Sequence, residues 1–303
     1  MTSIGLVGYG RWGKHIFRDL RALGADVHVA VPSAASRAEA LAKGAASVCS
    51  DCSLLPQVDG FVVATPTMTH ASVLSELTSR ERPIFVEKPM SDDLEQAQAL
   101  VKAAGERIFV MDKWRYHPGV EALAARAKSG ALGDILGIRT FRLGWDNPHK
   151  DVDAIWILLP HDLSIAYEIL GYLPPARSAI ATVPGQGHSN LIAVLSGPTE
   201  TCQVTMEISA HHPVSRRSVI VVGSKASAQL ADSYDDRIFI AEGVPGINAS
   251  TPTHEHVASE FPLLRELRAF LEYIQGGAAP RSSASEGLLF VERVAALRRL
   301  AGV

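Results

Sequence analysis

The sequence predicts an α/β domain with a doubly wound parallel sheet, followed by an α+β domain with a large, mostly antiparallel open sheet. Three observations support this fold class. Short apolar strands alternate with helices up to about residue 111, and a glycine-rich stretch, GYGRWG, fills the first strand–helix link. From residue 177 to residue 240 the chain consists mostly of strands, which is typical of an antiparallel sheet with helices on one face. Because 303 residues exceed one ordinary core, we expect two domains, residues 1–114 and residues 115–303.

The first domain is predicted from short buried strands that alternate with helices. A glycine closes the first helix, and Pro32 stops the second strand. The predicted strands are Ile4–Val7, Val27–Val31, Gly60–Ala64, Pro83–Val86 and Arg107–Met111. The predicted helices are Lys14–Leu23, Arg37–Lys43, Ala71–Thr78 and Asp92–Ala104. Strict alternation with short links predicts a doubly wound parallel sheet.

The pattern changes near Trp114, where the second domain is expected to begin. The predicted helices of this domain are Pro118–Lys128, Asp162–Leu170, Leu263–Ile274 and Glu286–Leu300. The predicted strands are Leu136–Leu143, Ser178–Val183, Leu191–Leu195, Cys202–Ile208, Val219–Val222, Ala228–Ala231 and Arg237–Ile240. Turns rich in Gly, Pro and Ser separate these strands.

The composition is that of an ordinary globular protein, 47% hydrophobic and 20% charged, with a formal net charge of −3. This charge gives no basic surface for nucleic acid or an anionic membrane. No apolar run reaches the roughly 18 residues needed to cross a bilayer. The first residues lead directly into a strand without the basic segment of a signal peptide. We therefore expect a cytoplasmic protein without a nucleic-acid or membrane partner.

Three cysteines are too few and too scattered for a disulfide framework. Cys49 and Cys52 have the spacing of a zinc or redox pair, but no second pair of ligands follows. Two further segments have side chains that can bind a metal, His211-His212 and His254-Glu255-His256, but they lack the helical H-E-x-x-H pattern. We therefore expect no metal, and interpret the cysteine spacing as a coincidence.

The glycine-rich stretch Gly8-Tyr9-Gly10-Arg11-Trp12-Gly13 predicts a dinucleotide site, because a strand precedes it and a helix follows. The first glycine permits a tight turn, the second lets the backbone approach a pyrophosphate, and the third allows the helix to pack closely on the strand. The helix N-terminus then presents free N–H groups to the phosphates. These features predict a Rossmann domain.

The end of the second strand distinguishes NAD from NADP, because an acidic residue there binds the ribose 2′-hydroxyl. The chain has no carboxylate between Val31 and Arg37. Ser33 and Arg37, with Arg11 as a further cation, could instead accept a 2′-phosphate. The expected cofactor is NADP or NAD, with NADP slightly favoured; the competing interpretation is that Arg37 is a solvated helix residue.

Further along the chain, Ala64-Thr65-Pro66 is followed by His70, and Glu87-Lys88-Pro89 follows a strand. Together with the glycine loop, these segments resemble the Gfo/Idh/MocA family of sugar and polyol oxidoreductases. The same resemblance is carried by Arg115-Tyr116-His117-Pro118, Pro160-His161-Asp162-Leu163, and Phe261-Pro262-Leu263 with Glu266 and Phe270. It spans nearly the whole chain. It implies an NAD(P)-dependent enzyme that transfers a hydride between nicotinamide and a secondary alcohol or ketone of a sugar, nucleotide sugar or cyclic polyol.

The resemblance also implies roles for individual residues. Lys88 is expected beside the nicotinamide and the reacting carbon, where its ammonium can stabilise alkoxide charge, and Glu87 beside the nicotinamide ribose. His161 is expected to act as general base or acid on the reacting hydroxyl, and Pro160 favours a helix start there. The full set of expected cofactor contacts is Gly8, Tyr9, Gly10, Arg11, Trp12, Gly13, Ser33, Arg37, Thr65, Pro66, His70, Glu87 and Lys88.

The sequence departs from the family pattern one helical turn before His161. The family usually has an aspartate there, and this chain has Ile157, which cannot share a proton. Lys88 and His161 could suffice without an acid. Alternatively, another side chain could substitute, or the protein could be a cofactor-binding sugar sensor or regulator with weak or no turnover. The candidates for substitution are Asp153, Asp162 and Tyr167.

The expected substrate contacts are Lys88, Arg115, Trp145, Asp146, Asn147 and His161. Trp145 offers an apolar ring for stacking, and the Asp-Asn pair offers partners for hydroxyl groups, which together suit a sugar. The family resemblance further implies a homodimer or homotetramer that forms through the exposed face of the second-domain sheet.

Overall fold

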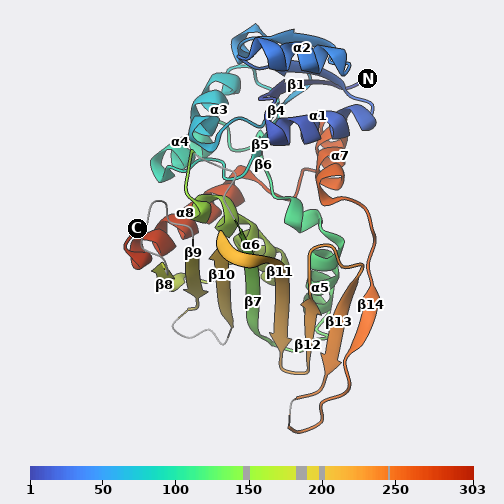
Figure 1. Ribbon diagram of the computed structural model, residues 1–303, viewed down its shortest axis with the longest axis vertical. Coiled ribbons are helices and arrows are strands. Elements are labelled where there is room, and N and C mark those ends of the chain that lie inside the picture. Colours follow the sequence, from blue (N-terminus) through green and yellow to red (C-terminus); the bar gives the residue numbers. More distant parts are fainter. Residues whose placement is uncertain (146–150, 182–189, 198–201, 245) are drawn as a thin grey trace. The chain divides into compact units, whose positions relative to one another are not determined.

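The computed structural model describes residues 1–145, 151–181, 190–197, 202–244 and 246–303. The chain divides into two compact units (Figure 1). The first unit comprises Met1–Lys113 and Phe261–Val291, and the second comprises Trp114–Glu260 and Glu292–Val303. The expected domains, 1–114 and 115–303, are contiguous, whereas the first unit also includes the C-terminal segment Phe261–Val291.

A six-stranded parallel sheet forms the centre of the first unit, in the order β3-β2-β1-β4-β5-β6. This is the strand order of a Rossmann fold, as the sequence predicted. The strands are β1 (Ser3–Val7), β2 (Asp26–Ala30), β3 (Ser47–Cys49), β4 (Gly60–Val63), β5 (Ile84–Glu87) and β6 (Ile108–Met111). The helices are α1 (Arg11–Ala22), α2 (Ala34–Ala42), α3 (His70–Thr78), α4 (Leu94–Ala104) and α7 (Pro262–Ile274), with short 3-10 turns η1 (Cys52–Leu54) and η2 (Thr67–Thr69).

Helix α7 belongs to the first unit because its apolar stripe packs into that unit's core. Leu263, Leu267 and Phe270 lie at helical spacing and are buried among residues of β1, β2 and α1. The ring of Phe270 stacks on Phe85 of β5 with centroids 4.9 Å apart. In Figure 1, α7 lies beside α1. The sequence shows this apolar stripe but not the surface that it covers.

An eight-stranded sheet forms the second unit, in the order β14-β13-β12-β11-β7-β10-β9-β8. Every neighbouring pair is antiparallel except β7 and β10, which confirms the predicted mostly antiparallel sheet. The strands are β7 (Ile135–Trp145), β8 (Ala176–Ala181), β9 (Asn190–Leu195), β10 (Gln203–Ser209), β11 (His211–Gly223), β12 (Ala226–Leu230), β13 (Arg237–Glu242) and β14 (Thr253–His256). The remaining elements are η3 (Lys113–Tyr116), α5 (Pro118–Lys128), α6 (Ala154–Leu170) and α8 (Ala284–Ala301), whose residues from Glu292 onward belong to this unit.

Helix α6 begins earlier than the sequence predicted. Asp153 caps it by accepting hydrogen bonds from the N–H groups of Ile155 and Trp156, at 3.1 and 3.2 Å. Pro160 therefore lies inside the helix rather than before its start. A proline there removes one backbone hydrogen bond, but the apolar side chains of the first turns are buried and hold the helix together. His161 is consequently a mid-helix residue.

The helices of the second unit cover one face of its sheet, with α5 against β12 and β13 and α6 against β7, β9 and β10.

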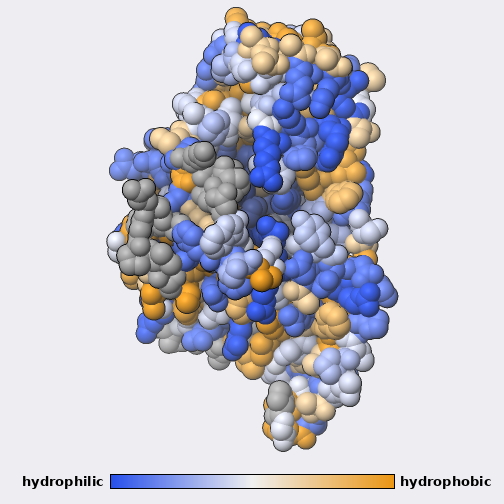
Figure 2. Space-filling model, viewed as in Figure 1, coloured by the Kyte–Doolittle hydropathy of each residue, from blue (hydrophilic) through white to orange (hydrophobic). Residues whose placement is uncertain are grey.

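On the face drawn in Figure 2, hydrophilic side chains predominate and hydrophobic ones gather in small groups. None of the helices in the described ranges has the length and apolar character that crossing a bilayer requires.

Candidate functional site

The glycine loop between β1 and α1 has room for a ligand at its second glycine. Gly8 has a φ of +99°, and a Cβ there would lie 2.4 Å from the carbonyl oxygen of Ala64. A Cβ at Gly13 would lie 2.4 Å from the carbonyl oxygen of Gly8. A Cβ at Gly10, in contrast, would meet no heavy atom of the described ranges within 4 Å. The outer glycines are thus required by packing, and Gly10 leaves open the space where a pyrophosphate would approach the backbone.

Helix α1 begins directly after this loop, and no side chain caps its N-terminus at Gly10. Its first N–H groups and the positive end of its dipole favour an anion. Arg11 is exposed at the first helical position, and the Lys113 ammonium lies 4.2 Å from the centroid of the Trp12 ring. These features fit a dinucleotide phosphate.

Tyr9 is among the predicted cofactor contacts, and its side chain lies in the interior of the first unit. Its side chain is 2% exposed and packs edge-to-face on Phe17 with centroids 5.4 Å apart. The tyrosine ring is therefore part of the first unit's core.

The end of β2 carries the residues predicted to distinguish NADP from NAD. Arg37 donates from Nη1 to the carbonyl oxygens of Val31 and Pro32, at 2.9 and 2.6 Å. The Ser33 hydroxyl caps α2 by accepting from the N–H of Ser36 at 3.3 Å. Both side chains thus stabilise the β2–α2 turn. Ser33 is exposed and Arg37 half-buried, so both stand at the surface of this turn.

His70 was predicted to contact the cofactor, and the structure places it in the interior. It is 1% exposed. Its Nδ1 lies 2.8 Å from the carbonyl oxygen of Pro89, and its Nε2 lies 2.9 Å from that of Thr65. The imidazole therefore links the segment after β4 to the segment after β5. Of the predicted residues in this segment, Thr65 is half-buried and Pro66 is exposed.

Charged residues gather where the neighbouring strands β5 and β6 end. Glu87 pairs with Met111 in the sheet register, so Lys88 and Asp112 follow at the same edge. Burial raises the pKa of Glu87, and the ammonium groups of Lys88 and Lys113 oppose this rise. Carboxyl ends of parallel strands are where ligands bind in open α/β sheets. The predicted residue Lys88 therefore stands at the ligand-binding edge of the first unit.

Helix α7 adds a carboxyl group to this region, Glu266, whose role the sequence did not indicate. Glu266 is 1% exposed, and none of the described residues forms a hydrogen bond with its Oε2. Burial raises the pKa of Glu266 well above its usual value, and the charges of Glu87 and Asp112 raise it further. An acidic residue on the apolar stripe of an amphipathic helix was the signal that could have identified it.

His161 is half-buried on α6 of the second unit, and Ile157, one turn earlier, is 5% exposed. The two carboxylates that could replace an acid at position 157 are held by other interactions. Asp153 caps α6 and forms an ion pair with Arg298. Asp162 is 1% exposed and forms an ion pair with Arg142 at 2.9 Å. The third candidate, Tyr167, lies beneath the guanidinium of Arg115 at 5.2 Å.

The predicted substrate contacts of the second unit have different environments. Arg115 is 7% exposed and forms an ion pair with Glu168 at 2.9 Å, which gives it a role in packing η3 against α6. Trp145, in contrast, is 71% exposed at the end of β7. Asp146 and Asn147 lie outside the described residues.

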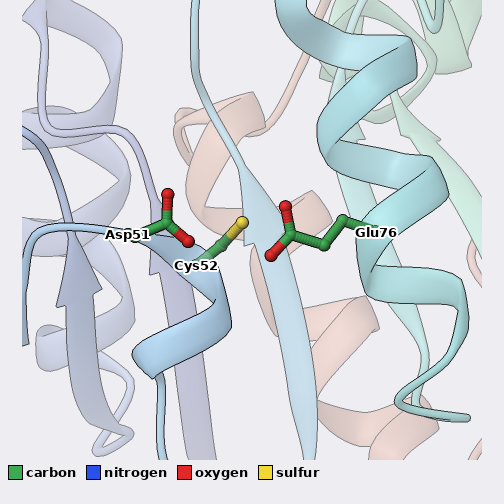
Figure 3. Close-up of side chains that lie close together, drawn as sticks. All are labelled: Asp51, Cys52 and Glu76. Carbon is green, nitrogen blue, oxygen red and sulfur yellow. The ribbon is translucent and has the colours of Figure 1, made fainter.

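The two cysteines with metal-ligand spacing do not face a common point. The Cys49 thiol lies 3.2 Å from the carbonyl oxygen of Asp51. Cys52 instead lies with Asp51 and Glu76, and their ligand atoms are within 4.8 Å of one another (Figure 3). Burial, together with a hydrogen bond to Glu76, raises the pKa of the Cys52 thiol to about 12. A thiol that keeps its proton can donate a hydrogen bond to the neighbouring carboxylate.

Comparison with known proteins agrees with this geometry. Residues 2–110 match the family model GFO_IDH_MocA, described as an oxidoreductase family with an NAD-binding Rossmann fold. Inositol 2-dehydrogenase of Rhizobium meliloti (strain 1021) is 24% identical over 95% of this chain and 93% of that protein. The 2,7-anhydro-N-acetylneuraminate hydratase of Escherichia coli (strain K12) is 25% identical over 57% of this chain. The chain spans about half the length of the first curated relatives that it matches, 51% and 47%.

A solved structure of levoglucosan dehydrogenase in complex with NADH and levoglucosan has the same fold. Its TM-score is 0.87 and its sequence identity is 17%, over 99% of this chain and 97% of that one. The strand order and the glycine loop define a dinucleotide-binding Rossmann domain. Residues 2–110 are similar to the Gfo/Idh/MocA oxidoreductase family, whose model they match.

Proposed function

We propose that the protein is an NAD(P)-dependent oxidoreductase that acts on a secondary alcohol or ketone of a sugar or cyclic polyol. The observation that carries this proposal is the glycine loop, in which packing requires the outer glycines while Gly10 remains open to a ligand. Lys88 supports it, because this cation stands at the ligand-binding edge of the same sheet. The similarity to inositol 2-dehydrogenase over nearly the whole chain supports the substrate class.

In this proposal, the bound nicotinamide supplies or accepts the hydride. Lys88 donates a hydrogen bond to the substrate oxygen and stabilises the negative charge that develops on it. His161 takes the hydroxyl proton during oxidation or returns it during reduction. His70 holds the segment that carries Lys88, through the carbonyl of Pro89. Glu87 contacts the nicotinamide ribose, and exposed Trp145 offers an aromatic face to a sugar ring.

We infer that the protein uses either cofactor and prefers NADP. No carboxylate stands at the end of β2 to repel a 2′-phosphate. Exposed Ser33 and half-buried Arg37 lie on the turn where that phosphate would bind. The hydrogen bonds from Arg37 to two carbonyls fix the orientation of its guanidinium.

The experiment that tests the function is a turnover screen. The protein is mixed with NAD⁺ or NADP⁺ and a panel of inositols, aldoses, anhydrosugars and nucleotide sugars, and reduced nicotinamide is followed by absorbance. We expect turnover with at least one cyclic polyol or sugar. Binding of cofactor without turnover on any member, or on the matching ketones with reduced cofactor, would contradict the enzymatic function.

A second candidate function, a cofactor-binding sugar sensor or regulator, is favoured by Ile157. This buried apolar side chain stands where the family usually has an acid, and Asp153 and Asp162 are held in ion pairs. The same screen separates the two functions, because a sensor binds sugar and cofactor without producing reduced nicotinamide.

We also propose that the uncovered face of the second-unit sheet pairs with a second copy of the chain. Ile180, Ile192, Glu207 and Phe141 form one cross-strand row on β8, β9, β10 and β7. Ile180 is 63% exposed and Ile192 is 41% exposed. Neighbouring exposed apolar side chains of this kind are typical of a protein–protein interface. Light scattering should show a dimer or tetramer, and Ile180→Lys should shift it toward the monomer.

A further inference from the structure

Trp114 lies at the centre of a buried cluster that reaches His161. Trp114 is 5% exposed on η3. The His161 imidazole meets its indole edge-to-face, with centroids 6.5 Å apart and ring planes at 64°. His117 stacks on the same indole with centroids 5.0 Å apart. Edge-to-face and stacked pairs at these distances are favourable and directional, so the indole constrains both imidazoles.

A buried cation contacts the same indole. Arg142 of β7 is 5% exposed, and its guanidinium carbon lies 4.6 Å from the centroid of the Trp114 ring. The guanidinium also donates from Nε and Nη2 to the two carboxylate oxygens of Asp162, at 2.9 and 3.3 Å. Arg142 is thus held in a two-pronged ion pair while its guanidinium lies over the indole.

These contacts form a closed circuit. Asp162 is the residue after His161 on α6, so the circuit runs from His161 to Asp162, to Arg142, to Trp114 and back to His161. The ion pair holds Arg142 and Asp162 together, and the Trp114 indole contacts both Arg142 and His161. The position one turn before His161 is Ile157, whose side chain offers no polar atom. A ring of packed side chains can fix the orientation of an imidazole, as a hydrogen bond to a carboxylate otherwise does.

We propose that Trp114, Arg142 and Asp162 are positioning residues that fix the ring orientation of His161, in place of an acid at position 157. The cation–π contact is strong when desolvated, and the rigid guanidinium transmits the position of Asp162 to the indole. This inference rests on the proposed function, since the orientation of His161 matters to turnover only if His161 holds the substrate proton.

The test compares Arg142→Lys and Trp114→Phe with a matched control. Lysine keeps the charge opposite Asp162 but has no planar group to lie on the indole. The control is Arg216→Lys, because the Arg216 guanidinium lies over the Phe141 ring at 4.4 Å on the same sheet but is exposed. We expect kcat to fall about 10- to 100-fold in both test variants, with a changed pH profile of kcat/KM. The KM of both test variants for the cofactor should remain at the wild-type value. The control variant Arg216→Lys should have wild-type kinetics.

A substrate-free measurement separates failure of this inference from failure of the proposed function. The ring-proton NMR signals of His161, identified by their loss in His161→Gln, are followed against pH. We expect both the position and the titration of these signals to change in Trp114→Phe and Arg142→Lys. Unchanged His161 signals in both variants would overturn the inference, whether or not the wild type turns over. A lower kcat with an unchanged pH profile would show a merely structural role and would also overturn it.

Discussion

Replacement of Gly10 by alanine should separate cofactor binding from folding. Gly10 has φ −77° and ψ −161°, which alanine adopts without strain, and the new methyl group meets no protein atom within 4 Å. As the N-cap of α1, alanine is somewhat worse than glycine, while loss of chain entropy in the unfolded state offsets this. We therefore expect the free energy of unfolding to change by at most about 1 kcal/mol.

Cofactor binding should respond much more strongly. The methyl group occupies the space through which the pyrophosphate reaches the backbone, so one or two charge-assisted hydrogen bonds are lost, at about 1.5–3 kcal/mol each. Loss of one such bond, about 1.5–3 kcal/mol, weakens the Kd roughly 10- to 150-fold, and loss of two weakens it further.

Calorimetric titration with NADPH and NADH measures this change, with Gly144→Ala as control because its new methyl group also meets no atom of the described part of the chain within 4 Å. Gly13→Ala, whose Cβ would clash with the Gly8 carbonyl, should instead lower stability by about 3 kcal/mol. A wild-type Kd for Gly10→Ala would refute the assignment of the loop.

Three further predictions concern single side chains. Lys88→Ala should lower kcat about 100- to 1,000-fold with little change in cofactor Kd, whereas the exposed control Lys102→Ala should have wild-type kinetics; full activity of Lys88→Ala would remove this residue from the mechanism. Arg37→Ala should weaken NADPH about 10-fold more than NADH in a calorimetric titration, and equal losses would show that Arg37 stabilises only its turn. Glu266→Gln should change the pH dependence of stability. The folded protein keeps a proton on Glu266 that the unfolded chain releases near pH 4.3, so the wild-type free energy of unfolding falls as pH rises above this value, by up to about 1.4 kcal/mol per pH unit, until the folded pKa is passed. Urea unfolding from pH 5 to pH 8 should show a smaller decline in the variant, and identical declines would contradict the protonated state.

The fold could be predicted because its signals are local. The glycine loop and the alternation of strands and helices each depend on residues close in sequence, and the structure confirms the parallel sheet that they predict. The unit to which α7 belongs could not be predicted, because the stripe of Leu263, Leu267 and Phe270 does not specify its partner surface. Pro160 likewise suggested a helix start, and the cap at Asp153 with the buried turn after it overrides that local preference.

The candidate site was predicted less completely than the fold. Sequence placed Lys88 at the end of a strand, and the structure keeps it there. The burial of the Tyr9 and His70 side chains could not be predicted, because it depends on packing that no local pattern reveals. Arg142 did give a signal, since it shares a strand face with buried Ile138 and a cation on such a face needs an anion.

Transfer of deuterium tests the central claim most directly. The protein is incubated with NAD⁺ or NADP⁺ and a mixture of inositols and sugars that carry deuterium on their ring carbons, and the reduced cofactor is examined by mass spectrometry and NMR. We predict one deuterium at C4 of the nicotinamide, and its disappearance in Lys88→Ala. Cofactor that binds to the protein but gains no deuterium from any member of the mixture would contradict an oxidoreductase acting on these substrates.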